Sequence, residues 1–99
     1  MVTIGSGPVY IGYRLAQWDD PRAKLVLEGG GNLSISATDI KVGVSAYGDY
    51  TRSSQGTLNA SNTPTVIEAS GTFEIGSDFN GTGWAYLGTG TTHVGSLVV

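Results

Sequence analysis

Glycine constrains this chain more than any other residue, because it fills 16 of the 99 positions. Glycine is unfavourable inside helices and is the ordinary residue of tight turns. Serine and threonine together supply about a fifth of all positions. A chain of this kind is expected to form short strands joined by glycine turns, and the sequence therefore predicts an all-β fold.

The length of the chain limits how much core it can bury. A chain of 99 residues corresponds to one domain, here residues 1–99, with a thin core that gains from disulfides, metals or association with other chains. The chain has no cysteine, and His93 is its single histidine. We therefore expect no disulfide, no metal site and no cofactor, which leaves association as the stabilising option.

Charge and hydropathy exclude two classes of partner. The formal net charge is -3, and only five residues are basic. So few cations cannot follow a phosphate backbone, so nucleic acid is not an expected partner. No apolar run approaches the roughly 20 residues needed to cross a bilayer, and the first five residues lack the pattern of a secretory signal. We expect no membrane partner.

Apolar residues alternate with polar ones in most of the chain, which is typical of half-buried strands. The pattern is clearest over residues 9–15, 33–37 and 40–46, and it changes parity at Thr38 and Asp39. Such a change indicates either a β-bulge or a tight turn, and we favour the bulge. Further strands are expected near residues 65–69, 72–75, 84–87 and 93–99. About eight short strands favour a small antiparallel β-sandwich or barrel.

Two local patterns bear on how the strands connect. Glycine precedes alternating apolar residues at Gly31, Gly56 and Gly71, but the unequal spacings of 25 and 15 residues argue against a solenoid. Residues 24–28 and 33–37 flank a glycine-rich turn and predict a hairpin. The alternative is a short helix beginning at Pro21 and ending at Glu28.

Reactive side chains are sparse. The serines and threonines share one histidine, and no Gly-x-Ser-x-Gly motif occurs, so a nucleophile with an adjacent base is not expected. Most carboxylates lie beside turn residues, where Asp forms local hydrogen bonds. Asp78-Phe79-Asn80-Gly81 resembles the start of a calcium loop but lacks the later ligands, and Asp19, Asp20 and Asp49 could share a cation only if folding joined them. We therefore expect no enzyme activity.

Aromatic residues support a competing function, because sugar rings stack on aromatic faces. Trp84 and Tyr86 share one face of a predicted strand, while Trp18, Tyr47 and Tyr50 flank predicted turns. In so thin a core, Trp84 is expected first as a core residue and only second as a ligand platform. Trp18 is the aromatic expected at a rim.

The two ends of the chain are apolar, although free termini are usually polar. We expect the segments 1–5 and 94–99 to pair with a sheet edge, either in the same subunit or, by strand addition, in a neighbouring chain. The candidate partner-binding residues are Val2, Ile4, Trp18, Leu97, Val98 and Val99.

The chain resembles the small decoration or cement proteins of bacteriophage capsids in its overall composition and in its short glycine-containing segments. Examples are Gly31-Asn32-Leu33-Ser34-Ile35 and Gly81-Thr82-Gly83-Trp84. The resemblance implies a virion protein, assembled in the host cytoplasm, that clusters with copies of itself, for example as a trimer, and clamps a major capsid protein. A tail or fibre component fits the same features. A glycan-binding or adhesive module is the alternative from another class.

Overall fold

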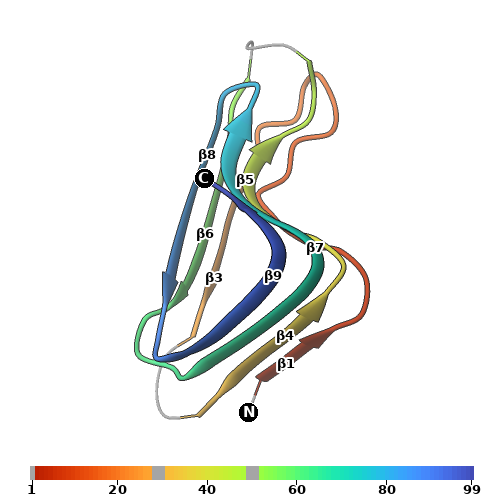
Figure 1. Ribbon diagram of the computed structural model, residues 1–99. Coiled ribbons are helices and arrows are strands. Elements are labelled where there is room, and N and C mark those ends of the chain that lie inside the picture. Colours follow the sequence, from red (N-terminus) through yellow and green to blue (C-terminus); the bar gives the residue numbers. More distant parts are fainter. Residues whose placement is uncertain (1, 28–30, 49–51) are drawn as a thin grey trace.

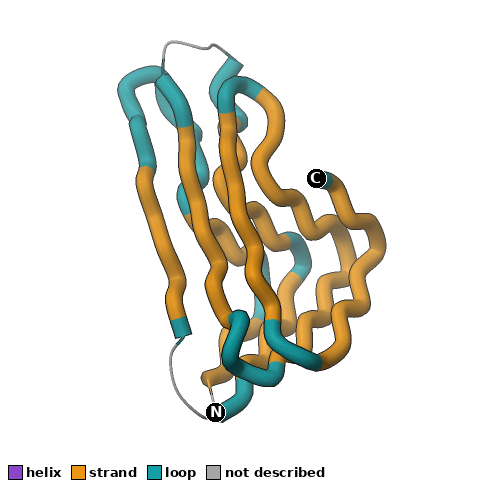
Figure 2. The backbone as a smooth tube through the Cα atoms, turned by 90° about the vertical axis from the view of Figure 1, so that its left-hand side faces the viewer, coloured by secondary structure: helices purple, strands orange, loops and turns teal. Residues whose placement is uncertain are grey.

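The computed structural model describes residues 2–27, 31–48 and 52–99. Within them the chain forms nine strands and no helix (Figures 1 and 2). The strands are β1 (Val2–Gly5), β2 (Val9–Ile11), β3 (Arg22–Val26), β4 (Leu33–Ala37), β5 (Ile40–Ser45), β6 (Ser54–Ala60), β7 (Thr65–Asp78), β8 (Gly81–Leu87) and β9 (Gly90–Val98). The prediction of an all-β chain is confirmed.

The predicted antiparallel sandwich or barrel is wrong, because every pairing among the described strands is parallel. The first coil of the chain consists of β1, β2 and β3, and the second consists of β4, β5 and β6. Residues paired between these two coils, such as Val2 with Leu33 and Arg22 with Gln55, stand 31 to 33 residues apart in the chain. Parallel neighbours need a long connection, and here the other strands of each coil supply it. The chain is thus a short solenoid whose sheets curl into an open half-barrel (Figure 1).

The coils share three faces. The first face stacks β1, β4 and the first halves of β7 and β9, and the second face stacks β2, β5 and the second halves of β7 and β9. The third face is a separate sheet in the order β3-β6-β8. Because β7 runs through the corner between the first two faces, it joins them into one six-stranded sheet.

The core consists of columns of apolar side chains that repeat from coil to coil. One column contains Ile4, Ile35 and Ile67, and a second contains Val9, Ile40 and Phe73. The third face contributes Leu25, Leu58 and Ala85. In each column the middle-coil residue is fully buried, because coils cover it on both sides.

The corner between the first and second faces explains the parity change at Thr38 and Asp39. Strand β4 ends before it and β5 begins after it, so the turn alternative is the one the structure contains. The next coil is bonded to it: the Asp39 carboxylate accepts a hydrogen bond from the Thr72 amide at 2.9 Å, and the Gly71 amide donates to the Thr38 carbonyl at 2.7 Å. The pairing irregularity lies in β7, between Ala69 and Thr72.

Glycine columns hold the second and third faces in backbone contact. Gly12, Gly43 and Gly76 follow the paired residues Ile11, Val42 and Ile75 and all have positive φ, at 69°, 67° and 56°. Gly56 and Gly83 pair with each other on the opposite face. A Cβ on Gly43 would lie 1.9 Å from the Thr82 carbonyl oxygen, and one on Gly83 would lie 2.1 Å from that of Val42. No side chain fits between the faces at this level.

Two further sequence predictions are wrong for related reasons. The predicted hairpin does not form, since β3 pairs with β6 whereas β4 pairs with β1 and β7; positions 28–30 of its turn lie outside the described residues. The helix alternative is replaced by β3. The unequal spacing of Gly31, Gly56 and Gly71 does not argue against a solenoid, because these glycines occupy unrelated points of the coil. They lie before β4, within β6 and at the corner of β7.

Candidate functional site

The third face carries a trough on its outer surface, which we call the outer trough. It has a volume of about 660 Å³ and is lined by Arg22, Ala23, Lys24, Val26, Gln55, Thr57, Asn59, Trp84 and Tyr86. Alternation along each strand directs these side chains outward, except that of Ala23, and sends Ala23, Leu25, Leu58 and Ala85 toward the core. The face is therefore solvated on one side only.

Register orders the outer trough into rows across the three strands. The middle row is Lys24, Thr57 and Trp84, and the next row is Val26, Asn59 and Tyr86. The short side chains of β6 form the floor between a wall on β3 and an aromatic wall on β8. Since neighbouring strands lie about 4.8 Å apart, the two walls stand about 10 Å apart at the backbone.

The expectation that Trp84 belongs to the core is wrong. Trp84 is 40% exposed and Tyr86 is 49% exposed, and both lie on the outer surface of β8. At the inward positions of this strand, Gly83 contacts the second face and Ala85 packs against the core. Because the faces approach so closely, an inward Trp84 has no space.

At the start of the outer trough, an ion pair fixes Arg22. Its guanidinium lies 2.9 Å from the Asp20 carboxylate and also donates to the Ser53 carbonyl and hydroxyl. Among the residues that the structure describes, no acidic side chain lines the trough. This surface therefore carries positive charge on a chain whose net charge is negative.

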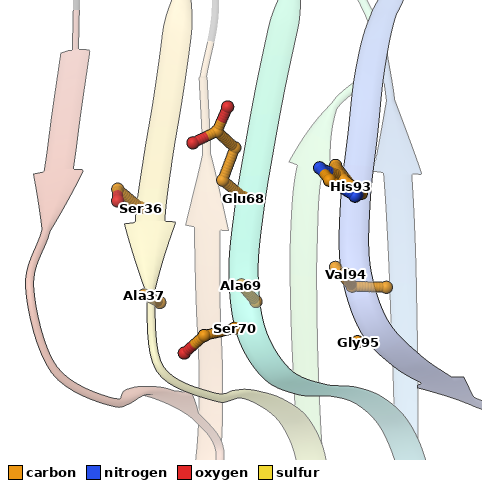
Figure 3. Close-up of a pocket in the computed structure, with 8 residues that line it drawn as sticks. All are labelled: Ser36, Ala37, Glu68, Ala69, Ser70, His93, Val94 and Gly95. Carbon is orange, nitrogen blue, oxygen red and sulfur yellow. The ribbon is translucent and has the colours of Figure 1, made fainter.

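The single histidine lies on a second hollow, on the outer surface of the first face. Ser36, Glu68 and His93 stand in one row across β4, β7 and β9, and all three are exposed (Figure 3). The hollow has a volume of about 550 Å³. Glu68 separates Ser36 from His93, so the serine lies about 10 Å from the base at the backbone, beyond the reach that a nucleophile and its base require.

No group of three or more metal-ligating side chains occurs among the residues that the structure describes. Asp20 pairs with Arg22, and Asp39 accepts from the Thr72 amide. The cation site considered for Asp19, Asp20 and Asp49 includes Asp49, which lies outside the described residues, as does Tyr50. The described part of the chain also includes no helix of the length and apolarity that a membrane crossing requires.

The candidate partner-binding residues fall at three separate places. Val2 is exposed on β1, whereas Ile4 is half-buried against the core column with Ile35. Leu97, Val98 and Val99 are exposed at the opposite end of the stack of coils, with Leu97 59% and Val99 85% exposed. Trp18 lies in the loop between β2 and β3, is 70% exposed, and has the Arg52 guanidinium 5.7 Å from its ring centroid.

Both ends of the stack have an open edge within the described residues. β1, β2 and β3 each pair on one side only, and so do β8 and β9. The apolar termini therefore pair with a sheet edge of their own subunit, as the first alternative held. The second side of β1 and β9 remains available to another chain.

Sequence reasoning did not identify the role of Arg14, which is fully buried. Its guanidinium donates to the Gln17 carbonyl at 2.6 Å and to the Arg52 carbonyl at 3.4 Å, and it lies 5.0 Å from the Tyr47 ring centroid. It thus joins the loop after β2 to the loop after β5. Arg14 is paired by a backbone bridge with Ser45, the last residue of β5.

A comparison of the chain with family models, with curated proteins and with solved structures gave no match.

Proposed function

We propose that the protein is a structural subunit of a virion, a phage capsid decoration or cement subunit that adds its end strands to the sheets of neighbouring chains. The observation that carries the proposal is the pair of open parallel edges, β1 at one end of the stack and β9 at the other. An unpaired strand edge is a template for another chain. Strand addition needs no reactive side chain.

The direction of the backbone groups supports this use of β9. The Thr65 amide donates to the Thr89 carbonyl at 2.9 Å, so Thr89 directs its polar groups toward β7. Successive residues of a strand alternate sides, so Gly90, Thr92 and Val94 direct theirs toward the open edge. These are the groups that an added strand would bond.

Exposed apolar side chains support association at the same end. Leu97 occupies the column of Val9, Ile40 and Phe73, but no coil covers it. Burial of a leucine side chain contributes about 2 kcal/mol. A partner strand laid on β9 would cover Leu97 in the way that β7 is covered by β9.

The setting of the proposal comes from the resemblance of the chain's composition to capsid decoration proteins. In that setting the partners are further copies of the chain, for example in a trimer, and a major capsid protein. A tail or fibre position would use the same edges. The low charge also suits dense packing, since repulsion between crowded copies stays small.

Light scattering after size-exclusion chromatography tests the proposal on the full chain, alone and mixed with candidate shell and tail proteins. We expect a mass above the 10.2 kDa of one chain, or a complex with one of these partners. Thr92→Pro should lower the association state, because proline removes an amide directed at the open edge but no bond to β7. Leu97→Lys should do the same by charging the end of the column.

The matched control is Val66→Lys, which places the same charge on an exposed valine of β7, a strand paired on both sides. This variant should assemble like the parent chain. A folded monomer without affinity for any of the tested virion proteins would overturn the proposal, and so would assembly that Thr92→Pro and Leu97→Lys leave unchanged.

A further inference from the structure

We propose that the outer trough binds an acidic polysaccharide, a chain of sugar rings that carry carboxylates. This inference does not depend on the virion role, because it uses the side-chain surface of the third face and neither open edge. It rests on the order of side chains in the rows, on their exposure and on the charge of the lining.

The aromatic wall offers the stacking surface. Trp84 and Tyr86 stand two residues apart on β8, about 7 Å along the strand, and both expose close to half of their surface. Large aromatic side chains stabilise a thin core most when they are buried. Here two of them lie side by side in solvent, and their apolar faces can cover the carbon-bound hydrogens of two successive sugar rings.

The floor offers hydrogen-bonding groups suited to sugar hydroxyls. Gln55, Thr57 and Asn59 follow one another at alternate positions of β6, and all face the trough. Amide side chains both donate and accept, and a threonine hydroxyl does the same. Sugar hydroxyls also donate and accept, so these side chains can form a hydrogen bond with a hydroxyl whichever way its hydrogen points.

The opposite wall determines the charge of the ligand. Lys24 faces Trp84 across Thr57, and the Asp20 ion pair holds Arg22 one row away. A ring stacked on Trp84 therefore directs its far side toward the Lys24 ammonium group. A carboxylate there gains a charge-assisted hydrogen bond.

The small number of cations in the outer trough favours a polysaccharide over a single-stranded nucleic acid. A nucleic acid presents a phosphate at every nucleotide and needs a groove that is positive along its length. The described lining of the outer trough includes two cations, of which Arg22 is already paired with Asp20, and the row of Val26, Asn59 and Tyr86 has none. One cation beside a polar floor fits rings with a carboxylate and several hydroxyls.

Tryptophan fluorescence of the Trp18→Phe chain tests the proposal, because Trp84 is then the only indole. The probes are polygalacturonate, its fully methyl-esterified form, and a single-stranded oligonucleotide. We expect polygalacturonate to cause a saturable change in the fluorescence of Trp84. The ester should bind about tenfold more weakly, since it keeps the rings and removes the charge.

Variants of the parent chain locate the site by calorimetric titration. Trp84→Ala should weaken polygalacturonate binding about tenfold or more, and Lys24→Met should remove the preference for the acid over the ester. Lys41→Met is the matched control: Lys41 lies on the second face, paired with Glu74, and its replacement should change neither affinity nor preference.

Three results would overturn the proposal. The first is the absence of a polygalacturonate signal at millimolar ring concentration. The second is binding that Trp84→Ala and Lys24→Met leave intact in chains whose circular dichroism matches the parent. The third is equal or tighter binding of the oligonucleotide, which would assign the trough to nucleic acid.

Discussion

At the scale of single residues, three glycines of the second face determine how closely the second and third faces pack. Gly12, Gly43 and Gly76 need the left-handed backbone region, and their opposite neighbours leave no space for a methyl group. Other glycines lack this requirement: Gly5 has its nearest neighbour atom 4.0 Å from a built Cβ and no positive φ. Glycine content alone therefore does not say which positions are essential.

Gly43→Ala should destabilise the fold strongly. A non-glycine residue in the left-handed region costs about 1 kcal/mol or more, and the contact with the Thr82 carbonyl forces the third face away from the second. We expect a loss of at least about 3 kcal/mol in the free energy of unfolding, measured by urea denaturation. Gly5→Ala is the control and should change stability by less than about 0.5 kcal/mol. Equal effects at both positions would show that the close approach does not limit packing.

Lys41 provides a pH dependence that can be assigned to one residue. The Glu74 carboxylate accepts a hydrogen bond from its ammonium group at 2.8 Å and raises the pKa of Lys41 above its ordinary value of 10.5. A raised pKa in the folded state gives stability that is fully present below the unfolded pKa and is lost as pH rises through the folded pKa.

Unfolding free energies of the parent and of Lys41→Met should therefore differ below pH 10 and converge as the pH rises above 10.5. The difference should be about 1 kcal/mol or less, because the pair is partly exposed. Lys24→Met, at an exposed position, should show no such convergence. A Lys41→Met difference that stays constant from neutral to alkaline pH would show that the ion pair does not contribute.

At the scale of elements, the positions of most strands could be predicted from the sequence but their partners could not. The segments 33–37 and 40–46 correspond closely to β4 and β5. A period of two indicates that one side of a strand is buried, but it does not distinguish parallel from antiparallel neighbours. The segment 9–15 ends early, at Ile11, because Gly12 has positive φ and turns the chain.

The signal for the parallel stack was in the sequence at another spacing. An apolar residue followed by glycine occurs at Ile11-Gly12, Val42-Gly43 and Ile75-Gly76, at intervals of 31 and 33 residues. These positions are equivalent in successive coils, whereas Gly31, Gly56 and Gly71 are not. The outer trough could be found only in part, since Trp84 and Tyr86 were paired correctly on one face but that face was assigned to the core.

Strand β9 should show alternating amide exchange, because only one of its edges is paired. Thr91 and His93 direct their amides toward β7, and Thr92 and Val94 direct theirs to solvent. We expect the first pair to exchange about tenfold or more slowly in a residue-resolved NMR experiment on the unassembled chain. Uniform exchange along β9 would contradict the pairing. Protection of Thr92 on assembly would identify β9 as the added edge.

At the scale of the whole molecule, the parallel stack differs from the predicted sandwich in what it presents to other molecules. A sandwich has side edges, whereas this stack has two ends and three long outer surfaces (Figure 1). Each coil contacts the coils beside it, so stability accumulates along the axis. The end strands have one neighbour each, and the middle strands β4, β5 and β6 have two.

The direct contact between the second and third faces also limits where a ligand can be held. At the level of Gly43 and Gly83 the main chains touch, so no channel passes through the middle of the protein there. A small molecule cannot be carried along the axis from one end to the other. We therefore expect any ligand of this chain to bind on its exterior, where changes to surface side chains can alter specificity without repacking the interior.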